Sequence, residues 1–270
     1  MTKQDIFEQI KTKRSYLCVG LDTDINKIPR ELKNSEDPVF EFNKRIIDST
    51  HDLCISYKLN LAFYETLGPA GLESLQKTVD YAPENIFLIA DAKRGDIGNT
   101  SNMYASEFFE FYNFDAVTLS PYMGKDSVDP YLKYPGKWAI LLALTSNKGS
   151  QDFQTLKTER GYVYEDVLDI SSAWGNSDQI MYVVGATKAS SLTNIRKIVP
   201  DNFLLIPGVG AQGGNLDEVT RFGINKTVGL IVNASRSIIY ASDGADFDQA
   251  ARSKSLEMQS EMEALLDKYY

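Results

Sequence analysis

Apolar residues in this chain gather in eight short runs that are separated by longer, more polar segments. The runs occupy residues 16–21, 54–59, 86–90, 116–119, 139–144, 180–184, 203–206 and 229–232. Each is four to six residues long, as expected for a strand buried on both faces. The spacing between successive runs is roughly 22 to 41 residues, which is the length of one strand–helix unit. The pattern therefore predicts eight strands connected by helices.

Several of the intervening segments show the apolar spacing of amphipathic helices. This period is present near residues 40–47, 72–79, 104–112, 167–170, 192–198 and 246–270, and a short helix capped by Thr2 is predicted before the first strand. There is no linker rich in Pro, Gly or Ser. We therefore predict an α/β fold in which residues 1–270 form a single-domain (β/α)8 TIM barrel. The main alternative is an open, doubly wound sheet.

Composition narrows the class of protein. The net charge is −9 and the sequence pI about 4.8, with no cluster of Lys or Arg, which argues against nucleic acid and anionic membranes as partners. No apolar run approaches the 18 residues of a membrane span, and the first residues do not resemble a signal peptide. Cys18 and Cys54 lie in apolar segments and are expected to be reduced core residues. These features favour a cytoplasmic protein.

The single histidine, His51, limits the chemistry that the chain can perform. A Ser-His-Asp triad or a histidine-rich zinc site would have to use this residue. It precedes a predicted strand, at the end of the barrel opposite to the usual active site. We therefore expect His51 to be structural.

Charged residues follow the third apolar run directly, in the segment Asp91-Ala92-Lys93-Arg94-Gly95-Asp96. Because side chains two positions apart on a strand point to the same face, Asp91 and Lys93 are predicted to lie side by side. With Lys58 from the second strand, opposite charges would alternate and hold each other ionised. An ammonium fixed in a dry pocket can stabilise a forming negative charge or donate a proton. The simpler interpretation is a surface salt bridge.

Glycines after the seventh run and Arg236 after the eighth predict a second site. The loops after these two strands commonly bind phosphate in such barrels, through backbone N–H groups and a bidentate Arg. Residues 208–213 also match the pattern G-x-G-x-x-G of dinucleotide-binding folds. That pattern belongs after a first strand, with an acidic residue about 20 positions later, and neither condition holds here. We therefore expect a phosphate site and no nicotinamide cofactor.

The segment Asp91-x-Lys93-x-x-Asp96-Ile97-Gly98-Asn99-Thr100 resembles the signature of the orotidine 5′-monophosphate decarboxylase family, in the form found in its longer bacterial subgroup. The resemblance extends to seven of the eight strand ends, at Asp22, Lys58, the signature itself, Pro121, Ser146, Gln212 and Arg236. It implies a (β/α)8 barrel that acts as a homodimer with shared active sites. The implied reaction converts orotidine 5′-phosphate (OMP) to uridine 5′-phosphate (UMP) and CO2 in pyrimidine biosynthesis, with no metal or cofactor.

The resemblance also implies roles for individual residues. Lys93 would stabilise and then protonate the carbanion at pyrimidine C6, while Asp91 faces the substrate carboxylate. Asp22 and Lys58 would bind the ribose hydroxyls, and Ser146 the pyrimidine. The phosphate would be held by Gln212 and Arg236, and the ribose of the partner's site would be reached by Asp96 and Thr100.

Two segments depart from the shorter members of this family. The stretch from Gln212 to Arg236 is longer, and residues 23–38 look like an insertion whose composition favours a solvated loop. A sugar-phosphate decarboxylase or aldolase of the same superfamily is the related alternative. Those relatives resemble metal-dependent enzymes, in which an acidic residue on the second strand binds the metal. This chain has Lys58 on that strand, which argues against a metal. A barrel without activity that serves as a binding module is the alternative from another class.

Overall fold

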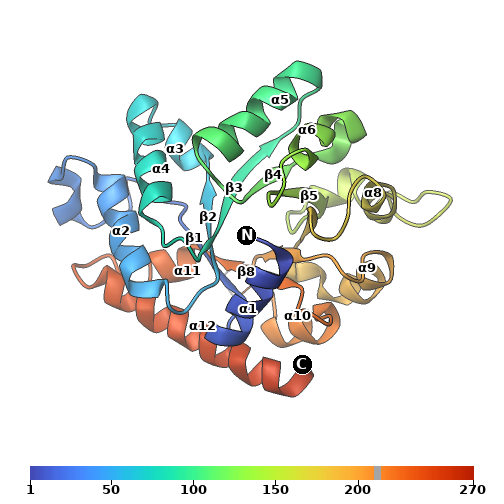
Figure 1. Cartoon of the computed structure of the whole chain (residues 1–270). Helices are drawn as coiled ribbons and strands as arrows, with labels where there is room; N and C mark the ends of the chain where they lie inside the picture. The colour runs from blue at the N-terminus through green and yellow to red at the C-terminus, as the bar shows by residue number, and fades with distance from the viewer. Residues whose placement is uncertain (210–213) are drawn as a thin grey trace.

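Eight parallel strands close into a barrel in the computed structural model, which describes residues 1–209 and 214–270. The strands follow one another in chain order, and the first pairs with the last, with Cys18 opposite Asn233. Helices surround the strands, as Figure 1 shows. The predicted (β/α)8 barrel is confirmed, and the open doubly wound sheet is excluded because an open sheet has two edge strands, whereas every strand here pairs on both sides.

The strands lie where the apolar runs predict them. They are β1 Leu17–Gly20, β2 Ser56–Asn60, β3 Phe87–Arg94, β4 Ala116–Leu119, β5 Trp138–Leu144, β6 Ile180–Val184, β7 Leu204–Pro207 and β8 Leu230–Ala234. The main difference is at β3, which continues four residues beyond the predicted end at Ala90. The charged segment that starts at Asp91 is therefore part of the strand, so the strand itself holds these side chains at the barrel mouth.

The six segments with helical period are confirmed as helices. They correspond to α2 Pro38–Thr50, α4 Pro69–Tyr81, α5 Gly98–Ser106 with the π-helix η2 Glu107–Phe111, α8 Val163–Ser172, α9 Leu192–Ile198 and α12 Phe247–Tyr269. Shorter elements are α3 Ala62–Glu65, α6 Asp129–Leu132, α7 Ser150–Phe153, α11 Arg236–Ile239, η1 Arg30–Asn34, η3 Pro121–Met123, η4 Lys125–Ser127 and η5 Ala186–Ser191. No helix in the described residues is both long and apolar enough to cross a bilayer.

Sequence analysis missed α10, which spans Leu216–Gly223. A signal for it was present, because the Asn215 side chain accepts a hydrogen bond from the Glu218 N–H, and Asp217 and Glu218 lie in the first turn. The helix has only eight residues, and too few apolar positions repeat within that length for the period to stand out.

The predicted helix before β1 is α1, Lys3–Lys13, and it begins with a reciprocal capping box between Thr2 and Asp5. Its residues Ile6 and Ile10 are fully buried. The Trp138 Nε1–H, at the start of β5, donates a hydrogen bond of 2.8 Å to the Met1 carbonyl. This contact places the segment at the amino-terminal ends of the strands, as expected for a helix that covers the barrel floor (Figure 1).

The prediction of a solvated loop for residues 23–38 is wrong in part. This segment contains the 3-10 helix η1, and its Ile28 is buried in the core. The Thr23 hydroxyl is also buried and donates to Asn43 Oδ1 on α2. Apolar and polar anchors thus fix the segment against α2, and its polar composition describes only its outer side.

The predicted positions of the histidine and the cysteines agree with the structure. His51 is exposed after the end of α2, and it is not among the residues that line the barrel cavity. Cys18 and Cys54 are both free and fully buried. Burial raises the pKa of the Cys18 thiol to about 12 and that of Cys54 to about 11, so both remain protonated at neutral pH.

One arginine side chain connects the segments between β6 and β8. Arg196, on α9, donates hydrogen bonds to the carbonyl oxygens of Val199, Asn202, Gly223 and Gly229. The substitution Arg196→Leu should lower the free energy of unfolding by about 2 kcal/mol, because several carbonyls lose their donor. Urea denaturation measures this change, with exposed Arg221→Leu as the control, expected within about 0.5 kcal/mol of wild type. Equal losses in the two variants would contradict the assignment.

Candidate active site

A cavity of about 520 Å³ opens at the carboxyl-terminal ends of the strands. Each of the eight strands, or the loop that follows it, contributes to its lining. The lining residues used below are Asp22, Lys58, Asn60, Asp91, Lys93, Thr118, Leu142, Thr145, Ser146, Gln154, Val183, Leu205, Pro207, Asn233, Ser235 and Arg236. This is the end at which barrels of this fold carry their active sites. The cavity is therefore the candidate active site.

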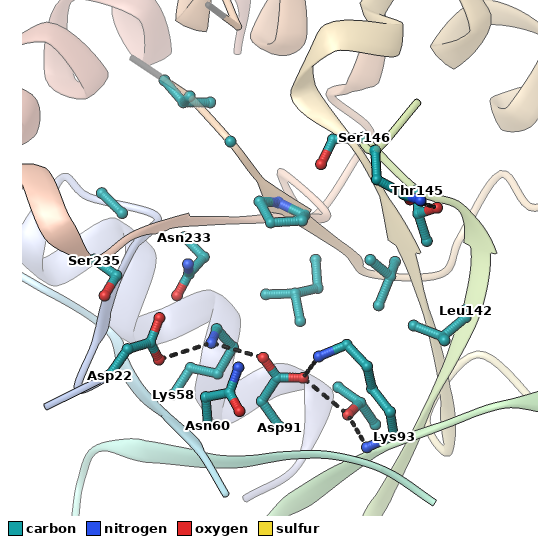
Figure 2. A pocket seen from close by; sticks show the side chains of 18 of the residues that line it. Asp22, Lys58, Asn60, Asp91, Lys93, Leu142, Thr145, Ser146, Asn233 and Ser235 are labelled. Carbon is teal, nitrogen blue, oxygen red and sulfur yellow. Dashed lines mark hydrogen bonds and ion pairs between the residues drawn. The ribbon is translucent and has the colours of Figure 1, made fainter. Parts of the chain in front are cut away.

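Four charged side chains of alternating sign, Asp22, Lys58, Asp91 and Lys93, form a continuous row across the cavity floor, as Figure 2 shows. The Lys58 ammonium lies 3.4 Å from Asp22 Oδ1 and 2.9 Å from Asp91 Oδ2. On the other side of Asp91, Lys93 Nζ lies 2.5 Å from Oδ1. Asp91 therefore holds two ammonium groups at once. Lys58, Asp91 and Lys93, whose charges the sequence predicts to alternate, are thus brought together, whereas Asp96 is not among these ion pairs.

Burial and charge act in opposite directions on the central pair. Burial alone would raise the pKa of Asp91, but the ammonium groups of Lys58 and Lys93 more than offset it and lower the pKa to about 2. Burial alone would likewise lower the pKa of Lys58, whereas Asp91 and Asp22 raise it above its ordinary value. Asp91 is thus an anion and Lys58 a cation across the physiological pH range. The simpler interpretation, a surface salt bridge, is wrong for this pair, because both side chains are buried.

A local irregularity in β3 positions Lys93. The β3–β4 register shifts between Ala90 and Arg94, and Lys93 has a φ of +48°, in the left-handed region that residues with a Cβ rarely adopt. Its N–H donates to Thr118 Oγ1 at 2.9 Å, and the same hydroxyl donates to Asp91 Oδ1 at 3.1 Å. Thr118 therefore ties the strained backbone to the carboxylate. Sequence analysis missed this residue, whose only signal is a hydroxyl within an apolar strand.

Ser146 lines the cavity just beyond β5, as predicted. Its position depends on Gly185, which follows β6, because a Cβ at residue 185 would lie only 2.7 Å from the Ser146 backbone nitrogen. Nearby, the Thr145 N–H donates to Gln154 Oε1 at 2.8 Å, which connects the two ends of the segment that contains α7. The segment of residues 146–154 is thus attached to the rim of the cavity by the Gln154 side chain.

Arg236 lies at the opposite rim, directly after β8, and its side chain is exposed to solvent at the cavity mouth. No carboxylate in the described part of the chain forms an ion pair with it, so its guanidinium is available to an anion. Ser235 Oγ, beside it, is buried and has no hydrogen-bond partner among the residues that the structure describes. Gln212, the other predicted phosphate ligand, lies outside the described residues.

Asp96 and Thr100 do not line the cavity of their own chain. Asp96 Oδ1 accepts a hydrogen bond of 2.8 Å from the Ile97 N–H, and Thr100 is exposed in the first turn of α5. The structure therefore separates these two predicted site residues from Lys58, Asp91 and Lys93.

The remaining cavity wall is apolar, with two further amides. Leu142, Val183 and Leu205, from β5, β6 and β7, give a surface against which a planar ring can pack. Asn60 and Asn233 were not predicted as site residues, because a single amide at a strand end is also common in structural positions. No cluster of three or more His, Cys, Asp or Glu side chains suited to a metal ion is present within residues 1–209 and 214–270.

Residues 15–250 match the model of the orotidine 5′-phosphate decarboxylase / HUMPS family. The chain belongs to this family. It is similar to the orotidine 5′-phosphate decarboxylase of Flavobacterium johnsoniae, with 59% identity over 270 residues and 99% of both chains covered. The enzyme of the same name from Bacteroides fragilis is 58% identical over 266 residues, which cover 97% of each chain.

A solved structure agrees with these relatives. The OMP decarboxylase of Leishmania donovani superposes with a TM-score of 0.85 at 35% identity, and 98% of each chain is covered. The predicted family, fold and decarboxylase activity are therefore confirmed: the chain is an enzyme that converts OMP to UMP and CO2.

The pKa of Asp91 leads to a prediction about stability and pH. Because this pKa is lower in the folded chain than its ordinary value of 3.8, ionised Asp91 stabilises the fold above about pH 4, and the stabilisation is lost as the pH falls toward 2. We expect wild type to lose about 1 kcal/mol between pH 5 and pH 3 beyond the loss shown by Asp91→Asn. Urea unfolding at each pH measures the difference. Parallel pH curves for the two proteins would contradict the lowered pKa.

Proposed function

We propose that Lys93 performs the central step of the decarboxylation. The bond between pyrimidine C6 and the carboxylate carbon breaks, CO2 leaves, and the electron pair stays on C6. The Lys93 ammonium stabilises this carbanion and then transfers a proton from Nζ to C6, which gives UMP and a neutral amine. Solvent returns the proton to the amine. The chain needs no metal or cofactor for this step, because the ammonium itself provides the positive charge.

The observation that supports this proposal is the geometry of the row of charged side chains at the cavity floor. Lys93 Nζ is fixed on Asp91 Oδ1 within the cavity, and Asp91 is held in turn by the buried Lys58. A cation that is already oriented does not have to reorganise when negative charge forms beside it. Lys93 remains about half exposed to the cavity, so a substrate atom can approach its ammonium.

Asp91 has a second role in the proposal, which is to face the substrate carboxylate. Its pKa of about 2 keeps it anionic at neutral pH, so two negative charges meet in the bound substrate complex. This repulsion is relieved when CO2 leaves as a neutral molecule, and the relief favours the transition state over the bound substrate. Lys58 and Lys93 keep the carboxylate ionised and in place.

The rest of the nucleotide is bound by residues around the rim. Asp22 and Lys58 take the ribose hydroxyls, Ser146 the pyrimidine, and Arg236 with Gln212 the phosphate. The absence of a carboxylate paired with Arg236 within the described residues supports its part in this assignment, because an unpaired guanidinium can bind phosphate through two parallel hydrogen bonds. Binding energy from the distant phosphate can then position the base over Lys93.

We further propose that two copies of the chain share their active sites. Asp96 and Thr100 lie outside their own cavity, in a segment whose neighbours include the exposed apolar side chains of Ile97 and Met103. Tyr122 and Met123, on η3, are also exposed. An apolar surface of this kind favours contact with a second copy, and Asp96 and Thr100 would then reach the partner's ribose.

Replacement of Lys93 tests the central role. Lys93→Ala should lower kcat by at least about a thousandfold, because both the stabilising charge and the proton donor are lost. The variant should still fold and bind UMP, which circular dichroism and calorimetry can establish. Retention of near-normal kcat would contradict the proposed role.

A mixture of two inactive variants tests the shared site. Lys93→Ala lacks the amine and Asp96→Ala lacks the group offered to the partner, so a mixed dimer contains one site with both residues intact. Subunit exchange should therefore restore up to about one quarter of wild-type activity if dimers form at random. If exchange is demonstrated by differently tagged subunits and no activity returns, each site is complete within one chain.

A further inference from the structure

Asn233 is a buried amide in the cavity wall to which no role has been assigned. It lies on β8, opposite Cys18 of β1 and Pro207 of β7 in the strand register, and only 8% of its surface is exposed. Figure 2 draws its side chain among the residues that line the cavity, together with Ser235, Asp22 and Lys58. An amide in such a position must find partners for both of its polar atoms.

The oxygen of this amide has a partner within the protein. Cys18 Sγ lies 3.5 Å from Asn233 Oδ1 and donates to it. Since burial holds the pKa of Cys18 at about 12, the thiol keeps its proton and remains a donor. The contact fixes the orientation of the amide, because a flipped side chain would bring the NH2 group against the S–H.

The nitrogen of the amide has no hydrogen-bond partner among residues 1–209 and 214–270. None of the residues that the structure describes accepts a hydrogen bond from Nδ2. The atom nevertheless retains some accessible surface, because it is not one of the fully buried polar atoms without a partner. In a residue this buried, whose side chain lines the cavity, the remaining accessible surface of Nδ2 faces the cavity. The thiol on one side thus directs an N–H donor toward the space where the nucleotide binds.

Close packing keeps the amide in this position. A Cβ on Gly20 of β1 would lie 3.2 Å from Asn233 Oδ1 and 2.6 Å from the Ser235 Cβ. The absence of a side chain at residue 20 therefore makes room at the cavity wall for Asn233 of β8 and for Ser235, which follows β8. The arrangement of Gly20, Cys18 and Asn233 presents a donor that is oriented before any ligand binds.

We propose that Asn233 Nδ2 donates a hydrogen bond to an oxygen of the ribose 5′-phosphate half of the nucleotide, and that Cys18 is the residue that positions it. This inference rests on the proposed function, which puts the ribose at Asp22 and Lys58 and the phosphate at Arg236. Asn233 lies between these groups along the wall formed by β8, β1 and β2. Ser146, which is assigned to the base, follows β5, and Leu142 of the apolar wall lies on β5, across the barrel from β1.

The first experiment measures binding without turnover. Calorimetry with UMP should show roughly tenfold weaker binding for Asn233→Leu, which keeps the size of the side chain but removes the donor. Asn233→Asp, which retains the acceptor for Cys18 but puts a carboxylate beside the anionic ligand, should bind more weakly still. Failure of wild type to bind UMP would overturn the proposed function. Wild-type affinity in both variants, with wild type binding normally, would overturn the role of Asn233.

Ribose 5-phosphate identifies the half of the nucleotide that is contacted. Ribose 5-phosphate should inhibit OMP turnover competitively. Its inhibition constant should rise in Asn233→Leu by roughly the same factor as the dissociation constant of UMP in calorimetry, because both ligands carry the accepting oxygen. Unchanged inhibition by ribose 5-phosphate together with weakened UMP binding would move the contact to the base and overturn the inference.

Substitutions at the two cysteines separate positioning from packing. Cys18→Ala should raise KM for OMP several-fold with little change in kcat, and Cys18→Ser, which restores a donor, should recover most of the affinity. Cys54→Ala is the matched control, because Cys54 is equally buried but does not contact Asn233, and its KM should equal that of wild type. Equal KM values for Cys18→Ala and Cys54→Ala would remove Cys18 from the proposal.

Discussion

The carboxylate of Asp91 is the group on which the site depends. It accepts hydrogen bonds from Lys58, Lys93 and Thr118, which come from three adjacent strands. Because Asp91 is buried, it can remain ionised only while these donors surround it. Each donor is oriented by the same contact, so the Asp91 carboxylate and the Lys93 ammonium form one unit. Loss of the anion would leave the Lys93 ammonium without its carboxylate partner and Lys58 with Asp22 alone, at 3.4 Å.

The barrel provides the rigidity that this unit requires. Lys58 and Asp91 extend from paired strands, and the register shift in β3 turns Lys93 back toward the carboxylate at the cost of a left-handed residue. Closure of β1 against β8 brings Asn233 and Arg236 to the same cavity from the far end of the chain. Residues more than 200 positions apart thus line one cavity, since the strand pairing fixes their distance.

Much of this arrangement follows from sequence pattern. The strands are short apolar runs of even spacing, and the alternation of side chains predicts that Asp91 and Lys93 meet. Two other residues of the cavity are not indicated by any sequence pattern. Thr118 is one hydroxyl in an apolar strand, and Asn233 one amide at a strand end, so only the three-dimensional pairing reveals their partners. The anchored part of residues 23–38 was missed because only a few buried residues, among them Thr23 and Ile28, fix its structure, while composition reflects the polar majority.

The central claim is that the Lys93 ammonium stabilises negative charge at C6 of the pyrimidine. A UMP analogue that carries an oxyanion at C6 imitates that charge, and the ratio of its dissociation constant to that of UMP isolates the interaction. Wild type should bind the analogue at least about a hundredfold more tightly than UMP, and Lys93→Ala should lose most of this preference while its affinity for UMP changes little. An unchanged preference in Lys93→Ala would show that another group stabilises the charge and would contradict the account.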